Sequence, residues 1–157
     1  MDVGVYGLWL FADLNTLMQS KVTKPVASFY KDNAESLVDE NAIFTFDGEI
    51  KGKIEASITR NLKREAIIKG PDLHITIHDK WWNPRVIDIT YRGEKHRISP
   101  PIRGGGFEYE AEHVCSLILE NKSHSDILCT NTSQTVTNMM ETALIEAGYG
   151  HLTHPEV

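Results

Sequence analysis

Apolar residues recur at two different periods along this 157-residue chain, and the change of period divides it into three parts. Residues 3–18 have the spacing of an amphipathic helix, with Asp2 in the position of an N-cap. The residues that carry this spacing are Leu10, Leu14, Leu17 and Met18. From residue 24 the period shortens to that of strands, most strictly over Ile50–Ile58, and from residue 107 the helical spacing returns.

The middle of the chain predicts seven short strands separated by turn residues. Their ranges are 24–30, 41–46, 50–58, 64–69, 73–78, 86–91 and 95–99. Asp47-Gly48 and Arg92-Gly93 are signals for hairpin turns. Because no helical segment interrupts this run, the sequence favours mainly antiparallel pairing over a doubly wound parallel sheet.

Two helices are predicted at the end of the chain. The first follows Gly104-Gly105-Gly106, and the second begins with Asn131 as N-cap and ends at Gly148. The order of elements predicts one α+β domain over residues 1–157, a single, mostly antiparallel open sheet with helices packed on one face. The other face of that sheet must then meet water or a partner.

Composition narrows the classes of partner. The net charge of −6 argues against nucleic acid and anionic membranes, and no apolar run reaches the ~20 residues of a membrane span. The N-terminal apolar stretch lacks the basic leader and cleavage site of a signal peptide. Cys115 and Cys129 lie far apart in the sequence, which predicts two buried thiols in a cytoplasmic protein rather than a disulfide.

The first candidate for chemistry is the pair Asp2 and Tyr6. Residues four apart share one face of a helix, where a carboxylate and a phenol can form a hydrogen-bonding and proton-transfer pair. Trp9 and Asp13 extend the same face. Periodicity alone favours the structural interpretations, with Tyr6 as a core aromatic, Asp2 as an N-cap and Trp9 as a packing residue.

Three further groups allow a functional and a structural interpretation. Trp81-Trp82-Asn83-Pro84 could stack on a sugar ring or plug a loop, and Gly104–Gly106 with Arg103 could bind an anion or connect flexibly to the helix. His74 and His78 fall on one side of a strand, opposite its apolar residues. No HExxH or paired Cys/His spacing supports a metal site.

Several segments together resemble the C-terminal domain of the Gfo/Idh/MocA family of NAD(P)-dependent oxidoreductases. They are Asp2–Leu8, Asn61–Gly70 ahead of Trp82-Asn83-Pro84, Gly106–Val114 and Thr135–Ala147. Tyr6 stands where many members of the family have His. The branch similar to glucose–fructose oxidoreductase and dihydrodiol dehydrogenase also carries Tyr there.

The resemblance implies a substrate-binding and oligomerisation domain of an enzyme that acts on a hydroxyl of a sugar, polyol or diol. Tyr6 would be the acid/base, Asp2 would orient the substrate, and Trp9 would line the same site. NAD or NADP would belong to the complete enzyme. The chain would form a homo-oligomer through the open face of its sheet, with Thr45, Phe46 and the outward positions of 50–58 as candidates.

The sequence lacks two parts that such an enzyme needs. The family's Glu-Lys-Pro lysine is absent, since Lys24-Pro25 follows Thr23, and Gly104–Gly106 is not GxGxxG because Tyr109 takes the third glycine's place. We therefore expect the chain alone neither to bind the cofactor nor to transfer hydride without a Rossmann domain. A stand-alone ligand-binding or scaffold module, or a subunit of a split oxidoreductase, is the alternative, and a zinc hydrolase built on the histidines ranks last.

Overall fold

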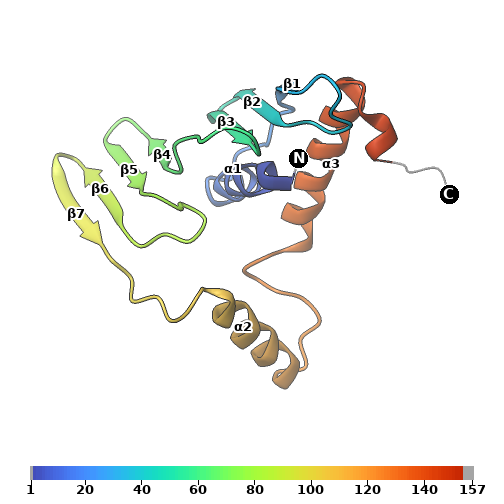
Figure 1. Cartoon of the computed structure of the whole chain (residues 1–157). Coiled ribbons are helices and arrows are strands. Elements are labelled where there is room, and N and C mark those ends of the chain that lie inside the picture. The colour runs from blue at the N-terminus through green and yellow to red at the C-terminus, as the bar shows by residue number, and fades with distance from the viewer. Residues whose placement is uncertain (1, 154–157) are drawn as a thin grey trace. The chain divides into compact units, whose positions relative to one another are not determined.

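The computed structural model describes residues 2–153, with only the backbone of Asp2 (Figure 1). Its helical elements are the 3-10 turn η1 (Asp2–Gly4), α1 (Val5–Leu17), α2 (Phe107–Leu119), α3 (Thr130–Glu146) and the 3-10 turn η2 (Gly150–Leu152). Its strands are β1 (Val26–Tyr30), β2 (Asn41–Asp47), β3 (Lys51–Ser57), β4 (Ala66–Lys69), β5 (Leu73–Ile77), β6 (Ile87–Tyr91) and β7 (Glu94–Ile98). The predicted α+β class and the predicted strands are confirmed.

The strands form two antiparallel sheets, in the orders β1-β2-β3 and β4-β5-β6-β7, where the sequence predicted a single sheet. The interruption follows β3, where residues 58–65 have no regular secondary structure. The chain correspondingly divides into two compact units. The first consists of the residues up to Leu62 and from His124 on, and the second of Lys63–Ser123.

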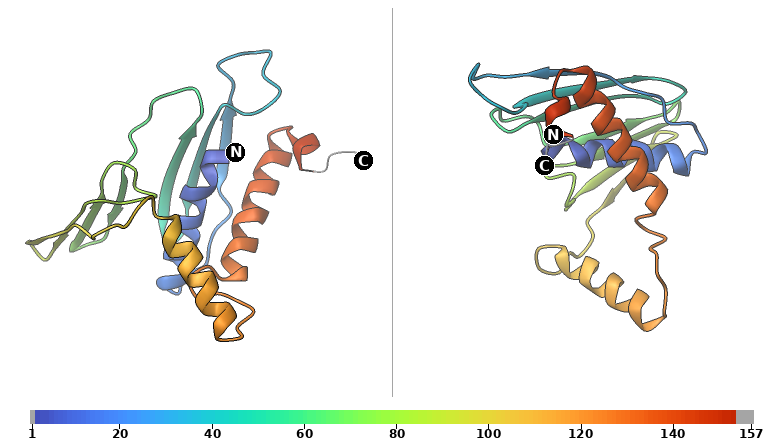
Figure 2. Two further views of the ribbon diagram at one scale, coloured as in Figure 1. Left: turned by 60° about the horizontal axis from the view of Figure 1, so that its bottom comes forward. Right: turned by 90° about the vertical axis from the view of Figure 1, so that its right-hand side faces the viewer.

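The first unit has a hydrophobic core between one face of its sheet and two helices. Figure 2 shows α1 and α3 on the same side of the three strands. The strand β2 supplies the inward residues Ala42, Phe44 and Phe46, and the Phe46 ring stacks on Phe11 of α1 at 3.9 Å between centroids. Phe46 is therefore a core residue and not the candidate for an oligomer surface that the sequence suggested.

Two glycines bring α1 close to β3. A Cβ on Gly7 would lie 2.5 Å from Cγ2 of Ile54, and a Cβ on Gly52 would lie 2.7 Å from the ring of Phe11. Both distances are shorter than real Cβ contacts allow, so the helix can pack at this depth only because these positions lack side chains. The alternation predicted for this strand is confirmed, because Gly52, Ile54 and Ala56 are the more buried residues.

The helix starts differ from the predictions. A 3-10 turn precedes α1, so its N-cap is Gly4 and not Asp2. The N-cap of α3 is Cys129, whose sulfur accepts a hydrogen bond from the Thr132 N–H at 3.4 Å, and Asn131 lies inside the first turn. The predicted end of α3 is confirmed: Gly148 has a φ of +83°, and the N–H of Tyr149 donates to Leu144 at 2.8 Å in a Schellman arrangement.

The second unit is a four-stranded meander followed by α2. Register places Ile68, Ile75 and Ile89 side by side in one row and Ile77, Ile87 and Ile98 in the next. We call these six residues the isoleucine face. The opposite face carries His74, Asp88 and Arg97, which confirms the predicted placement of His74 on the polar side.

Neither cysteine is in a disulfide, as predicted, but neither is fully buried: Cys115 is exposed and Cys129 is half-buried. Within residues 2–153, no helix combines the length and the apolarity that crossing a membrane requires.

Candidate functional site

Tyr6 lies in the first turn of α1, on the side of the helix that faces away from the core. Leu8, two residues on, is fully buried, and two residues on a helix are separated by about 200°. The Tyr6 side chain is accordingly 53% exposed. The close contact of Gly7 with β3 fixes the height of this turn above the sheet. The structure thus presents the phenol on a rigid element.

Trp9 lies three residues further along α1 and packs at the edge of the core. Its Nε1 is buried and has no hydrogen-bond partner among the described residues. Tyr6 and Trp9 occupy adjacent positions on the helix, as the sequence predicted. The side chain of Asp2 lies outside what the structure describes, so its pairing with Tyr6 stays a prediction.

The aromatic turn and the glycine run, which the sequence treated separately, meet in the second unit. The Asn83 side chain donates to the Gly105 carbonyl at 2.9 Å, and Trp81 and Trp82 form an edge-to-face pair. Gly104 and Gly106 have φ values of +51° and +104°, which explains why glycine is used there. This arrangement supports the structural interpretation of both motifs.

The N-terminus of α2 is already occupied by a carboxylate of its own chain. Glu108 accepts hydrogen bonds from the N–H groups of Gly105 and Gly106, at 3.3 and 2.9 Å. The hydrogen bond from its own N–H foremost, and then the one from Gly106, lower the pKa of its carboxyl. Arg103 pairs with Glu112 at 2.6 Å. The donors that could have bound a phosphate are therefore engaged, and both described sheets are antiparallel. The glycine run therefore does not leave these two N–H groups free for the phosphates of a dinucleotide.

His78 belongs to an ionic cluster on the polar face of the second sheet. Its Nε2 lies 2.7 Å from Asp88, whose carboxylate also accepts two hydrogen bonds from Arg97 at 2.6 and 2.7 Å. The guanidinium of Arg97, and then His78, hold the pKa of Asp88 well below its ordinary value. Residues 2–153 contain no group of three His, Cys, Asp or Glu side chains placed to hold a metal ion.

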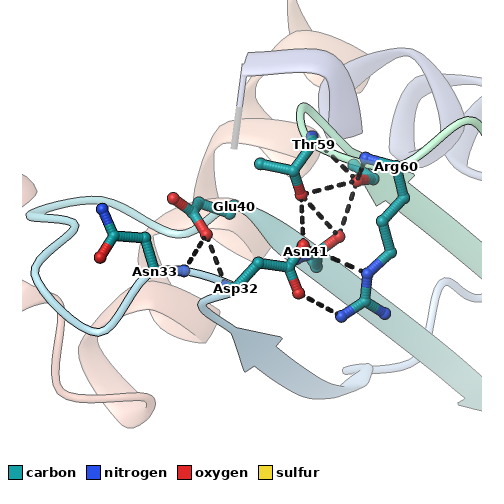
Figure 3. Close-up of polar contacts among 7 residues, drawn as sticks. Asp32, Asn33, Glu40, Asn41, Thr59 and Arg60 are labelled. Atoms are coloured by element: carbon teal, nitrogen blue, oxygen red, sulfur yellow. Dashed lines mark hydrogen bonds and ion pairs between the residues drawn. The ribbon is translucent and has the colours of Figure 1, made fainter.

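A second ionic cluster lies at the strand ends of the first unit, and no sequence motif indicates it (Figure 3). Asp32 accepts hydrogen bonds from Arg60, from Thr59 at 2.5 Å and from Asn41 at 3.0 Å. We call these four residues the aspartate clasp. Arg60 foremost, then Thr59 and Asn41, keep the pKa of Asp32 well below its ordinary value.

The clasp and the residues next to it hold two loops against the sheet by hydrogen bonds. Glu40 accepts hydrogen bonds from the N–H groups of Asp32 and Asn33, at 2.5 and 2.9 Å, which hold the loop between β1 and β2. The Ser57 hydroxyl donates to Asn41 at 2.6 Å at the end of β3. Every member of the clasp is engaged with another, so we assign it a structural role.

Curated relatives of the chain share one name. The chain is 30% identical over 129 residues to trans-1,2-dihydrobenzene-1,2-diol dehydrogenase of Xenopus tropicalis, a match that covers 77% of the chain and 38% of the relative. It is 20% identical over 149 residues to the enzyme of that name from Homo sapiens, covering 90% of the chain and 43% of the relative. The chain thus spans less than half the length of these relatives. No protein-family model matches it.

Solved structures give the same fold. The aldose-aldose oxidoreductase of Caulobacter crescentus superposes with a TM-score of 0.70 at 13% identity, covering 92% of the chain and 44% of that structure. The UDP-N-acetylglucosamine 3-dehydrogenase of Acidithiobacillus ferrooxidans superposes with a TM-score of 0.67 at 15% identity, covering 95% and 49%. In each case the likeness covers nearly the whole chain but only about half of the neighbour.

Proposed function

We propose that this chain, which is of the Gfo/Idh/MocA oxidoreductase type and matches its C-terminal domain, supplies the substrate-binding side of a dehydrogenase. The substrate would be a sugar, polyol or diol with a hydroxyl to be oxidised. The names of the relatives support a diol or sugar hydroxyl as the reacting group. The chain alone would be inactive.

The observation that carries the proposal is the placement of Tyr6. Tyr6 is 53% exposed and lies on a helix that is anchored to a sheet through a glycine contact, so a substrate can reach it and its backbone position is fixed. Positioned proton donors and acceptors of this kind contribute about 10²–10⁴-fold to a rate. Tyr6 would exchange the proton of the substrate hydroxyl, Asp2 would orient that hydroxyl, and Trp9 would border the site.

The proposal requires groups from outside this chain. A phenol has an ordinary pKa of ~10 and needs a nearby cation to act near neutral pH. The complete enzyme would supply that cation. It would also bind NAD or NADP, for which residues 2–153 show no binding site. A Rossmann domain is therefore the expected partner, and a cytoplasmic location is part of the proposal.

We further propose that the chain forms a homo-oligomer through an open sheet face. The isoleucine face supports this idea, because two adjacent rows of isoleucines lie on one side of four strands. Contiguous apolar surface of this kind is typical of protein interfaces. The outer face of the first sheet, which includes Thr45, is more polar and is the second choice.

Reconstitution tests the enzymatic proposal. The chain is mixed with a matching Rossmann domain, and reduction of NAD or NADP is followed with trans-1,2-dihydrobenzene-1,2-diol as substrate. We expect turnover only when both parts are present. If the mixture forms a complex but shows no turnover with diols, sugars or polyols, the stand-alone binding module is the better interpretation.

A further inference from the structure

A cleft of about 300 Å³ lies in the first unit, between α3 and the segment that leads into β1. One wall is the segment Val22–Pro25, and the other is a single face of α3. The apolar part of its lining includes Met139 and Ala143, which also belong to the hydrophobic core. The volume falls at the lower end of the range of small-molecule sites, about 300–1,000 Å³.

The uncharged polar side chains on the α3 wall have no hydrogen-bond partner among residues 2–153. Thr135, Asn138 and Thr142 follow one another along one helix face, and none of them makes a side-chain hydrogen bond to any residue in 2–153. Threonines elsewhere on the helices behave differently: Thr137 donates to Ser133 at 3.0 Å and Thr16 to Ala12 at 3.1 Å. The hydroxyls in the cleft are therefore not used to satisfy the helix backbone.

The opposite wall adds no accessible hydroxyl, because Oγ1 of Thr23 is buried and lies 2.9 Å from where a Cβ on Gly48 would be. Lys24 and Glu146, one from each wall, form an ion pair at the rim. Because these two charges neutralise each other, the cleft carries no net charge.

A second cavity shows that this pattern is not general. It has a volume of about 200 Å³ and lies beside the aspartate clasp. Its polar lining includes Asn41, Ser57 and Arg60, and each of these is already hydrogen-bonded within the clasp. Tyr30 also lines this cavity, but only the larger cavity has a row of hydroxyl and amide groups without partners among the described residues along one helix face.

We propose that the cleft between residues 22–25 and α3 binds a small uncharged polyhydroxylated molecule, of the size of one sugar ring or a short polyol. Two threonine hydroxyls and one amide can each both donate and accept, which matches ligand hydroxyls. The apolar lining of Met139 and Ala143 matches the C–H face of such a ligand. The site involves no residue of the proposed Tyr6 site, so it is a second binding site on the chain.

The test uses the full 157-residue chain and two probes, D-glucose and glycerol, in a titration followed by backbone amide NMR. We expect saturable shifts in the amides of residues 135–143 and 22–25 with at least one probe. Thr142→Val removes one hydroxyl at nearly constant shape, and we expect it to weaken binding about five- to tenfold, the effect of one hydrogen bond.

Thr137→Val is the matched control, because this hydroxyl bonds to its own helix and does not line the cleft. It should bind the probe as the natural chain does. The amide spectrum of each variant without probe reports whether the fold is kept, and Asn138→Leu serves as the second variant if Thr142→Val alters it. The proposal is overturned if neither probe gives saturable shifts, if the shifts map to Tyr6 instead, or if the cleft variant and the control weaken binding equally.

Discussion

The two units of the chain are built from similar antiparallel strands but differ in what those strands bury. In the first unit Phe44 and Leu8 are 0% exposed, and every residue of the core cluster comes from this unit. In the second unit, Lys63–Ser123, all of which the structure describes, no residue is buried to that degree. Yet its strands are richer in β-branched residues than those of the first unit.

The difference shows where each unit obtains its stability. The first unit has two helices to cover one face of its sheet, so the apolar residues of β2 are removed from water. The second unit has the backbone ladder, the Asp88 cluster and an isoleucine face that is only partly covered. Since hydrophobic burial is the main favourable term in folding, we expect the first unit to determine stability and the second to gain from association.

Truncation of one phenylalanine in each unit gives the largest contrast. Phe44→Ala removes a fully buried ring and should lower the free energy of unfolding by about 3–5 kcal/mol. Phe107→Ala removes a ring that is 78% exposed and should change it by no more than about 0.5 kcal/mol. Urea unfolding followed by circular dichroism measures both. Equal losses would mean that the core is not confined to the first unit.

The glycine contacts give the next largest effect. Gly52→Ala places a Cβ 2.7 Å from the Phe11 ring, which is stacked on Phe46 and cannot yield, so we expect a loss of about 1–3 kcal/mol. Gly70→Ala in the second unit is the control, because its Cβ would make an ordinary contact of 3.6 Å with Leu73. The same urea titration compares them. A neutral Gly52→Ala would show that α1 does not depend on this close approach.

The isoleucine face can be tested with two substitutions on neighbouring residues of β6. Ile89→Asp puts a charge in the row with Ile68 and Ile75, and should convert the proposed oligomer into monomers. Thr90→Asp puts the same charge on the opposite face, beside His74 and Lys95, and should leave the oligomer intact. Size-exclusion chromatography with light scattering gives the molar mass. Loss of assembly in Thr90→Asp alone would assign the interface to the polar face.

Lowering the pH should have the smallest effect on the stability of the fold, and it should act on both units. The pKa of Asp32 and the pKa of Asp88 are lowered in the folded chain, chiefly by Arg60 and Arg97 respectively. A carboxyl with a lowered pKa contributes stability above its unfolded pKa of ~3.9, and that contribution is lost as the pH falls below this value. Both pairs are exposed, so the loss is small and is reduced by salt.

The aspartate substitutions separate the two contributions. Asp32→Asn should flatten the acid dependence of amide signals around Asn41, and Asp88→Asn that of signals around Thr90. An unchanged acid dependence in either variant would show that its ion pair does not form in solution.

The sequence predicted the elements well because their signals are local. The alternation of Ile50–Ile58 and the helical spacing after residue 107 each depend on neighbouring residues, and both are confirmed. The start of α3 was predicted at Asn131 because asparagine is a better N-cap than cysteine, but the chain places Cys129 there. The division into two sheets had no local signal, since residues 58–65 contain no proline or glycine.

Sites made by distant residues were harder to predict. Asp32 and Arg60 meet only because β1, β2 and β3 pair in a particular register, which the sequence does not specify. One sequence pattern indicates the cleft on α3, namely the recurrence of Thr135, Asn138 and Thr142 beside an apolar stripe. The second wall of the cleft lies more than a hundred residues away in the sequence. Tyr6 was identified from a resemblance, and the structure adds its exposure and its anchoring.

The central claim is that Tyr6 is the acid/base of the proposed dehydrogenase. It is tested most directly by the turnover number of Tyr6→Phe after the chain is reconstituted with a matching Rossmann domain. Tyr30→Phe is the matched control, since this phenol is 48% exposed, close to the 53% of Tyr6, but lies on β1. We expect Tyr6→Phe to lower kcat by about 10²–10⁴-fold with little change in substrate affinity, and Tyr30→Phe to leave kcat unchanged. If the two variants turn over equally fast, Tyr6 is not the acid/base of this enzyme.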